Sequence, residues 1–250
     1  MKVHITGASG FIGTALCSVV KRTSLEEAEA VVHLAGIAHR RASAEELQRV
    51  NVNFAVEMAK KAAAKGAAFL FMSTVKVHGE EGSFTESSRI APSDPYAASK
   101  ARAEEALHAI PGLRLTVLRP PLVYGPGVKA NFLSLMQAIA RGLPLPLASI
   151  QNRRSLVFVG NVVDAIVHCT GKAGTFLVSD GNAVSTPDLC RAIGAAIGRP
   201  ARLVPFPAAL LPRKLRGSLT VDDALIRRSW RPPHAMEEGL ARTAAWYAGR

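Results

Sequence analysis

The sequence predicts an α/β fold, a doubly wound parallel sheet with helices on both faces and a small C-terminal lobe. Short apolar runs alternate with segments of helical periodicity through the first half of the chain. A glycine turn, Gly7-Ala8-Ser9-Gly10-Phe11-Ile12-Gly13, separates the first apolar run from the first helical segment. The 250 residues are enough for one large domain, or for one domain with an appended lobe.

The first half of the chain divides into strands and helices in alternation. Residues 2–6 form an apolar strand that runs into the glycine turn, and 11–21 have helical periodicity. Residues 44–65 are rich in Ala, Glu and Lys and end at Gly66, which is typical of a helix. The remaining predicted elements of this half are the buried strands 30–35, 68–73 and 115–118 and a helix over 96–109 that a proline loop introduces.

The pattern changes after Tyr124-Gly125-Pro126-Gly127. Proline-rich stretches at 143–147 and 205–212 interrupt it. The predicted elements are helices over 132–141, 162–169 and 187–198, an apolar run at 156–159 and a strand at 175–178. We therefore expect a dinucleotide-binding domain made of 1–125 and about 155–180, and a substrate-binding lobe made of about 126–154 and 181–250.

The composition limits the possible classes of protein. No apolar run approaches the roughly 20 residues that a membrane helix needs, and the first residues show no signal-peptide pattern. Cys17, Cys169 and Cys190 are far apart, so we expect reduced thiols in a cytoplasmic protein. No histidine or cysteine spacing predicts a metal site. The net charge of +12 favours an anionic ligand or a solvated basic surface, and the absence of interleaved aromatic residues argues against nucleic acid.

The glycine turn has the context of a dinucleotide-binding site. Gly7, Gly10 and Gly13 follow a strand and open a helix. Glycines allow a tight turn and let a pyrophosphate approach backbone N–H groups. A strand–helix turn without a ligand is the alternative. We expect the turn to hold the cofactor of a redox reaction.

A second motif supplies acid/base groups. Tyr96 and Lys100 are four residues apart on a predicted helix and so share a face. A nearby ammonium favours the phenolate, so we expect Lys100 to lower the pKa of Tyr96 from its usual value of about 10. Ser73 and Thr74 lie upstream at the carboxyl end of a predicted strand, the edge at which open α/β sheets bind ligands. Together these groups predict proton and hydride transfer at a carbinol or ketone carbon.

The chain resembles a known family over nearly its whole length. The segments TGASGFIG, VVHLAG, VNVNFA, FMSTVKVHG, YAASK and LRPPLVYGPG occur in order. This combination is similar to the extended short-chain dehydrogenase/reductases, in the nucleotide-sugar epimerase/dehydratase group, whose fold is Rossmann-like. The segments GVKANF and NRRSLVFVGNVVDAI resemble a bacterial subgroup that acts on UDP-sugars for surface polysaccharide.

The resemblance implies a role for each matching residue. Tyr96 would be the acid/base, Lys100 would hold the nicotinamide ribose and Thr74 would be the catalytic hydroxyl, with Ser73 in support. The implied contacts with NAD, NADP being the alternative, come from Gly7, Gly10, Phe11, Ile12, Gly13, Leu34, Ala35, Gly36, Asn51, Tyr96, Lys100 and Pro121. The implied substrate contacts come from Thr74, Lys76, Tyr124, Asn131 and Arg154, where an Arg fork suits a diphosphate. His33 and His78 are expected to be packing residues.

One departure from the family is large. The family places two further strands and a helix between the glycine helix and VVHLAG, whereas here only residues 22–29 separate them. The sheet is therefore expected to lack two edge strands, together with the residue that would choose NAD or NADP. A direct right-handed connection would move the glycine helix to the other sheet face. An unusual crossover, a displaced helix and an internally shortened chain are the alternatives.

We expect an NAD-dependent 4-epimerase of a UDP-hexose or UDP-N-acetylhexosamine that works through a 4-keto intermediate. A 4-keto-sugar reductase that consumes NAD(P)H has the same motifs and is the nearest alternative. A non-catalytic relative that binds nucleotide or RNA is the alternative from another class, and the shortened glycine half motivates it. The resemblance also implies a homodimer through the helices 44–65 and 96–109, and no membrane partner.

Overall fold

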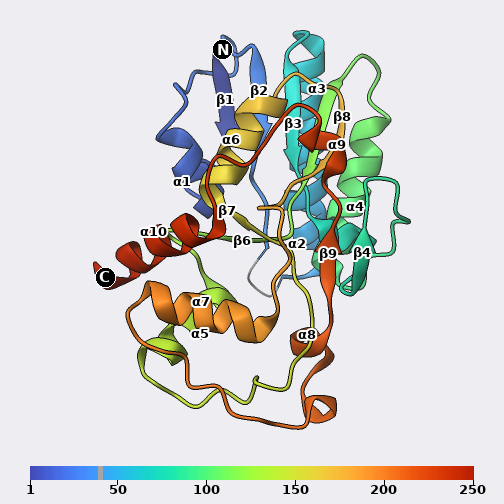
Figure 1. The fold of residues 1–250 in the computed structure, drawn as a ribbon. Helices are drawn as coiled ribbons and strands as arrows, with labels where there is room; N and C mark the ends of the chain where they lie inside the picture. Colours follow the sequence, from blue (N-terminus) through green and yellow to red (C-terminus); the bar gives the residue numbers. More distant parts are fainter. Residues whose placement is uncertain (39–41) are drawn as a thin grey trace.

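A five-stranded parallel sheet forms the centre of the protein, in a computed structural model that describes residues 1–38 and 42–250 (Figure 1). In spatial order its strands are β1 (Val3–Thr6), β2 (Ala30–His33), β3 (Ala68–Met72), β5 (Arg114–Arg119) and β8 (Gly174–Leu177). Every residue of β2 and β3 is buried, as expected for apolar strands with helices on both sides. The predicted α/β class with a parallel sheet is confirmed.

Helices cover both faces of the sheet. One face carries α1 (Phe11–Cys17) and α6 (Val159–Cys169), which pack through Leu16 and Ile166 on Val32 and Leu70 of the sheet. The helices of the other face are α2 (Ala44–Leu47), a π-helical turn η1 (Gln48–Asn53), α3 (Phe54–Ala64) and α4 (Pro95–His108). The alternate strand residues Val31 and Phe69 face α3 and α4, as the two-residue strand period requires.

The short link after α1 produces a crossover of unusual hand. β1, β2 and β3 follow each other across the sheet in one direction, so the units β1–α1–β2 and β2–α3–β3 advance the same way. Their helices nevertheless lie on opposite faces, so the two crossovers have opposite hands. β1 is an edge strand, and its outer side forms an isolated parallel bridge between Val3 and Arg22. An unusual crossover, one of the three predicted alternatives, is therefore observed.

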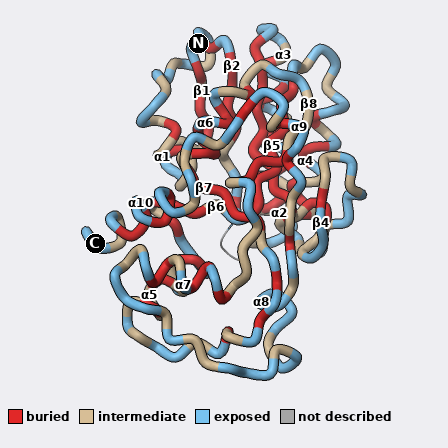
Figure 2. Tube along the Cα trace, viewed as in Figure 1, coloured by how far each residue is buried: buried red, intermediate tan, exposed pale blue. Residues whose placement is uncertain are grey.

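The C-terminal half builds a second hydrophobic cluster beside the sheet. The cluster includes Tyr124, Phe132, Phe158 and Ile193, and red stretches in Figure 2 mark its buried residues on α5 and α7. Its helices are α5 (Ala130–Ala140), α7 (Thr186–Ala196) and α10 (Met236–Ala248). Two short parallel strand pairs lie outside the central sheet: β4 (Gly82–Phe84) pairs with β9 (Leu219–Val221), and β6 (Leu122–Tyr124) pairs with β7 (Leu156–Phe158). The remaining short helices are η2 (Val75–His78), η3 (Ala208–Leu210), α8 (Arg213–Arg216) and α9 (Ala224–Arg227).

Some predicted boundaries differ from those observed. α1 ends at Cys17 rather than at residue 21, because the chain turns over Ser18 and Val19 to reach the outer edge of β1.

The three cysteines are free thiols, and burial raises the pKa of both Cys169 and Cys190 to about 11. Within 1–38 and 42–250, no helix is long and apolar enough to cross a bilayer, and no group of three His, Cys, Asp or Glu side chains could hold a metal ion.

Candidate active site

The predicted catalytic hydroxyl lies at the carboxyl end of β3. Thr74 is buried, and its Oγ1 accepts a hydrogen bond of 3.3 Å from the Lys76 N–H, which caps η2. The backbone on either side is fixed to the neighbouring strand end, because Ser73 donates to Leu118 O at 2.8 Å and Val75 donates to Pro120 O at 3.0 Å. Thr74 therefore lies at the sheet edge where α/β proteins bind ligands.

Helix α4 brings the acid/base pair to the same edge. Asp94 caps the helix by accepting a 2.7 Å hydrogen bond from Ala97, and Pro95 occupies the first turn. The second carboxylate oxygen of Asp94 lies 3.3 Å from Lys76 Nζ, so the cap also ties α4 to η2. The cap fixes the first turn of the helix, from which Tyr96 and Lys100 follow on one face.

Lys100 is buried on the β3 side of α4. Its Nζ donates to Met72 O at 2.8 Å and lies 4.5 Å from the centre of the Phe71 ring. Burial lowers the pKa of Lys100 to about 8, and the charge of Glu104 opposes that shift. Near neutral pH the side chain is therefore a cation that changes its charge readily.

Tyr96 is half-buried, and its pKa is raised rather than lowered. Burial is the main cause, and the Asp94 carboxylate adds to it. The prediction that Lys100 lowers the pKa of Tyr96 is therefore wrong for the free protein, in which the ammonium of Lys100 donates to Met72 O. Tyr96 is predominantly a neutral phenol here, and a further positive charge would be needed to favour the phenolate.

Asn51 joins the segment after β2 to helix α4. Its Oδ1 accepts from the Ile37 N–H at 2.8 Å, and its Nδ2 donates to Ile37 O at 3.2 Å and to Ser99 Oγ at 2.8 Å. Asn51 is completely buried within the π-helical turn η1, which interrupts the single helix predicted over 44–65. π-helical turns are rare in proteins, and those that occur are often found at functional sites. A functional role for Asn51, as predicted, is consistent with this.

The glycine turn packs directly against the segment that follows β2. Gly7 has a φ of 73°, and a Cβ atom there would lie 2.6 Å from Ala35 N. A Cβ on Gly36 would lie 3.2 Å from Asn51 Oδ1 and 3.4 Å from Lys100 Nζ. The turn, residues 34–36, Asn51 and Lys100 are therefore packed one against the next, so that predicted cofactor residues adjoin the lysine of the acid/base pair.

A cavity of about 550 Å³ opens beside the glycine turn at the outer edge of β1. It is lined by Ile5, Gly7, Ala8, Ser9, Thr14, Cys17 and Arg22. Arg22 is the charged member of this lining and lies next to β1, to which it is joined by the bridge with Val3. The bare glycine backbone and a cation suit the phosphates of a dinucleotide, so these residues fit NAD or NADP.

A second cavity, of about 490 Å³, lies between Glu81, which follows η2, and segments of the C-terminal half. It is lined by Glu81, Ser149, Ile150, Gln151, Ala208, Arg213, Arg216 and Gly217. Next to the cavity, ion pairs join η2 to the basic run, since Glu80 lies 3.3 Å from both Lys76 and Lys214. Arg213 and Arg216 were not predicted as site residues, although the basic run 213–216 was the available signal.

Of the predicted substrate residues, Arg154 lies beside this cavity, whereas Tyr124 lies in the hydrophobic core. Arg154 donates to Lys214 O next to the cavity, and burial lowers the pKa of its guanidinium. Lys76 is held by two carboxylates, and Asn131 is exposed on the first turn of α5. Tyr124 is completely buried and its hydroxyl donates to Asp180 at 2.8 Å, so its predicted contact with substrate is wrong and its role is packing.

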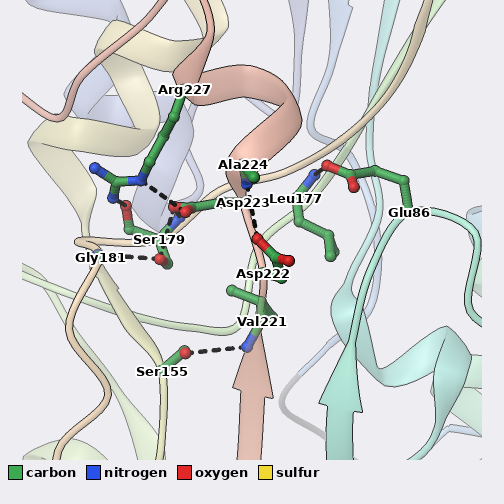
Figure 3. Close-up of polar contacts among 10 residues, drawn as sticks. All are labelled: Glu86, Ser155, Leu177, Ser179, Gly181, Val221, Asp222, Asp223, Ala224 and Arg227. Carbon is green, nitrogen blue, oxygen red and sulfur yellow. Dashed lines mark hydrogen bonds and ion pairs between the residues drawn. The ribbon is translucent and has the colours of Figure 1, made fainter.

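A polar network fixes the chain that carries the basic run. Asp223 accepts hydrogen bonds from Ser179 N and Oγ at 3.2 and 2.8 Å and from Arg227 Nε at 2.6 Å (Figure 3). The same view shows Ser155 accepting from Val221 N and Glu86 accepting from Leu177 N. The Asp223 bonds join the start of α9 to the carboxyl end of β8, and the Ser155 bond joins β9 to the residue before β7. The preceding basic run is paired directly with the loop after η2, through Arg213 with Glu81 and Lys214 with Glu80.

Known proteins share both the sequence pattern and the fold. The model of the NAD dependent epimerase/dehydratase family matches residues 18–176. A UDP-glucose 4-epimerase of Vibrio cholerae is 38% identical over 252 aligned residues, which cover 88% of this chain and 77% of that protein. The structure of a UDP-N-acetylglucosamine 4-epimerase from Bacillus cereus has a TM-score of 0.86 at 16% identity, and each chain is covered completely. A UDP-glucuronic acid 4-epimerase from Bacillus cereus, in complex with NAD, has a TM-score of 0.83 at 17% identity over all of this chain and 99% of that one.

Proposed function

The chain belongs to the NAD dependent epimerase/dehydratase family, and on this premise we propose that it interconverts the C4 epimers of a UDP-hexose or UDP-N-acetylhexosamine. The observation that supports this most is the position of Lys100, which lies beside Gly36 and Asn51 next to the glycine turn and also donates to Met72 O, two residues before Thr74. The similarity to a UDP-glucose 4-epimerase over most of the chain supports the substrate class.

The cofactor would bind along the surface from the glycine turn to Lys100. Residues 7–13 and 34–36 would face its phosphates and adenosine, while Lys100 and Pro121 would lie at the nicotinamide end. Bound NAD supplies the acceptor and donor of the C4 hydride and also a positive charge. That charge and the Lys100 ammonium together oppose the effects that raise the pKa of Tyr96 in the free protein.

The protein groups would carry out the proton transfers. Tyr96, as the phenolate, takes the proton of the sugar 4-hydroxyl when C4 is oxidised, and Thr74 Oγ1 hydrogen-bonds the same oxygen. The 4-keto sugar then turns over in the site, and Tyr96 returns the proton after reduction on the other face. Arg154, Arg213 and Arg216 would hold the diphosphate during this rotation, because the guanidinium forks suit phosphate oxygens.

Replacement of Tyr96 tests the proposal. We expect Tyr96→Phe to lower kcat by at least about 1,000-fold, because the proton-transfer group is lost, while UDP-sugar affinity measured by calorimetry stays within about twofold. The half-buried Tyr247 on α10 offers a matched control, since Tyr247→Phe should leave both quantities unchanged. Full activity of Tyr96→Phe would contradict the assignment.

Two finer features belong to the same proposal. The similarity of GVKANF and NRRSLVFVGNVVDAI to the polysaccharide subgroup supports a role in the supply of surface sugars.

A homodimer would use the outer sides of α3 and α4, whose inner sides are occupied by the sheet. Light scattering after size-exclusion chromatography should give a mass near twice 26.5 kDa, and a mass of one chain would contradict the dimer.

A further inference from the structure

Helix α4 presents a third ionisable side chain on the face of the acid/base pair. Tyr96, Lys100 and Glu104 follow at four-residue intervals, so Glu104 lies one turn beyond Lys100. Only 4% of Glu104 is exposed. A carboxylate in that position must be paired or hydrogen-bonded, because burial of an isolated charge is very unfavourable.

The partners of Glu104 connect the ends of two strands. Ser73 Oγ donates to Glu104 Oε1, and Arg119 Nε lies 3.1 and 3.2 Å from the two carboxylate oxygens. Ser73 is the residue before Thr74, and Arg119 precedes Pro120, whose carbonyl accepts from Val75. Glu104 therefore holds the backbone on both sides of Thr74, directly through Ser73 and indirectly through Arg119.

The far end of Arg119 is also fixed. Its Nη1 lies 3.0 Å from His78 Nε2, and a guanidinium can only donate, so His78 Nε2 is the acceptor. The imidazole proton is then on Nδ1, which donates to Arg89 O at 3.1 Å. Burial lowers the pKa of His78, so this ring is neutral at pH 7. The charge of Arg119 is therefore balanced by its ion pair with Glu104.

Among the described residues, Glu104 is the charged group that acts on Lys100. His33 on β2 is a neutral ring, and Asn51 on η1 and Met72 on β3 offer uncharged contacts. Asp94 is at the helix start, where it pairs with Lys76. Burial favours a neutral Lys100, and the Glu104 carboxylate is what opposes this effect.

We propose that Glu104 is a positioning residue of the active site, which fixes Thr74 through Ser73 and balances the charge of Lys100 from one helical turn away. The proposal relies on the proposed function for the reacting groups. It assigns Glu104 two separable effects. One is geometric and acts through the Ser73 hydroxyl, and the other is electrostatic and acts on Lys100.

Glu104→Gln tests the electrostatic effect, because it keeps the shape of the side chain and removes its charge. The ε-carbon signal of Lys100, followed by NMR in the free protein, should titrate at a pH lower by about 0.5 to 1 unit than in the parent protein. The basic limb of the kcat/KM profile should move in the same direction. Glu105→Gln is the matched control on the exposed side of α4 and should change neither.

Ser73→Ala tests the geometric effect and keeps the Glu104–Arg119 pair. We expect kcat to fall about tenfold while the Lys100 titration stays unchanged. Unchanged Lys100 titration in Glu104→Gln, or full activity of Ser73→Ala, would overturn the proposal. If Glu104→Gln does not fold, Glu104→Asp keeps the charge at a shorter reach and must preserve the Lys100 titration while lowering kcat. The titration needs no substrate, so a failure of the proposed function is distinguishable from a failure of this inference.

Discussion

His33 should make the stability of the protein fall in mild acid. Its ring is completely buried at the end of β2, among Phe54, Phe69 and Phe71, and Nδ1 lies 2.9 Å from Thr6 Oγ1. Nε2 is buried without a hydrogen-bond partner among the described residues. Burial and then the Lys100 charge lower the pKa of His33 to about 3.

The size of the effect follows from the two pKa values. The unfolded chain takes up a proton near the ordinary His pKa of 6.5, whereas the folded protein does so only near 3. The unfolded state binds more protons between these values, so stability rises with pH in this window and is lost as the pH falls through it. One pKa unit corresponds to about 1.4 kcal/mol, so a change from pH 7 to pH 5 should cost about 2 kcal/mol through His33.

Urea unfolding at several pH values measures this contribution. The parent protein should lose about 2 kcal/mol more unfolding free energy between pH 7 and pH 5 than His33→Gln does, whatever the absolute stability of the variant. His108→Gln, at the exposed end of α4, is the control and should keep the parent slope. Equal slopes in the parent protein and His33→Gln would refute the reasoning.

Two further predictions concern the cavities. Gly7→Ala should abolish NAD binding, measured by calorimetry, because a Cβ there meets Ala35 N at 2.6 Å and the φ of 73° disfavours a side chain. Gly66→Ala, which has open space around it, should lose only about 1 kcal/mol of stability. Retained NAD binding by Gly7→Ala would contradict the role of the glycine turn in holding the cofactor. Arg216→Gln should raise the KM for the UDP-sugar about tenfold and keep kcat within twofold, because a charge-assisted bond to the diphosphate is lost. Arg191→Gln, on the exposed side of α7, should change neither constant. An unchanged KM in Arg216→Gln would show that the second cavity is not part of the substrate site.

Local sequence signals predicted the strands and the main helices because each of these depends on its own residues. The apolar runs around Phe69 and Val117 became buried strands of the central sheet. The glycine turn also lies where its strand–helix context indicated. The hand of the first crossover could not be predicted, since a link as short as 22–29 leaves the choice of face to packing of Leu16 on α6 and the sheet.

Other features depend on contacts between distant segments. The π-helical turn around Asn51 is fixed by bonds to Ile37 and Ser99, and nothing in the local periodicity marks it. Spacing alone suggested that Lys100 would lower the pKa of Tyr96, but burial and a cap carboxylate, which spacing does not report, determine the direction. For the same reason Glu104 was not recognised, because its importance comes from strand ends far away in the sequence.

Product analysis tests the central claim most directly. The protein is incubated with catalytic NAD and either UDP-glucose or UDP-N-acetylglucosamine, and the anomeric and H4 proton signals are followed by NMR. The account predicts conversion to a mixture with the galacto epimer, in the parent protein and not in Tyr96→Phe, and no net formation of NADH. Absence of the epimer from both substrates, in protein that binds NAD and the UDP-sugar, would contradict it.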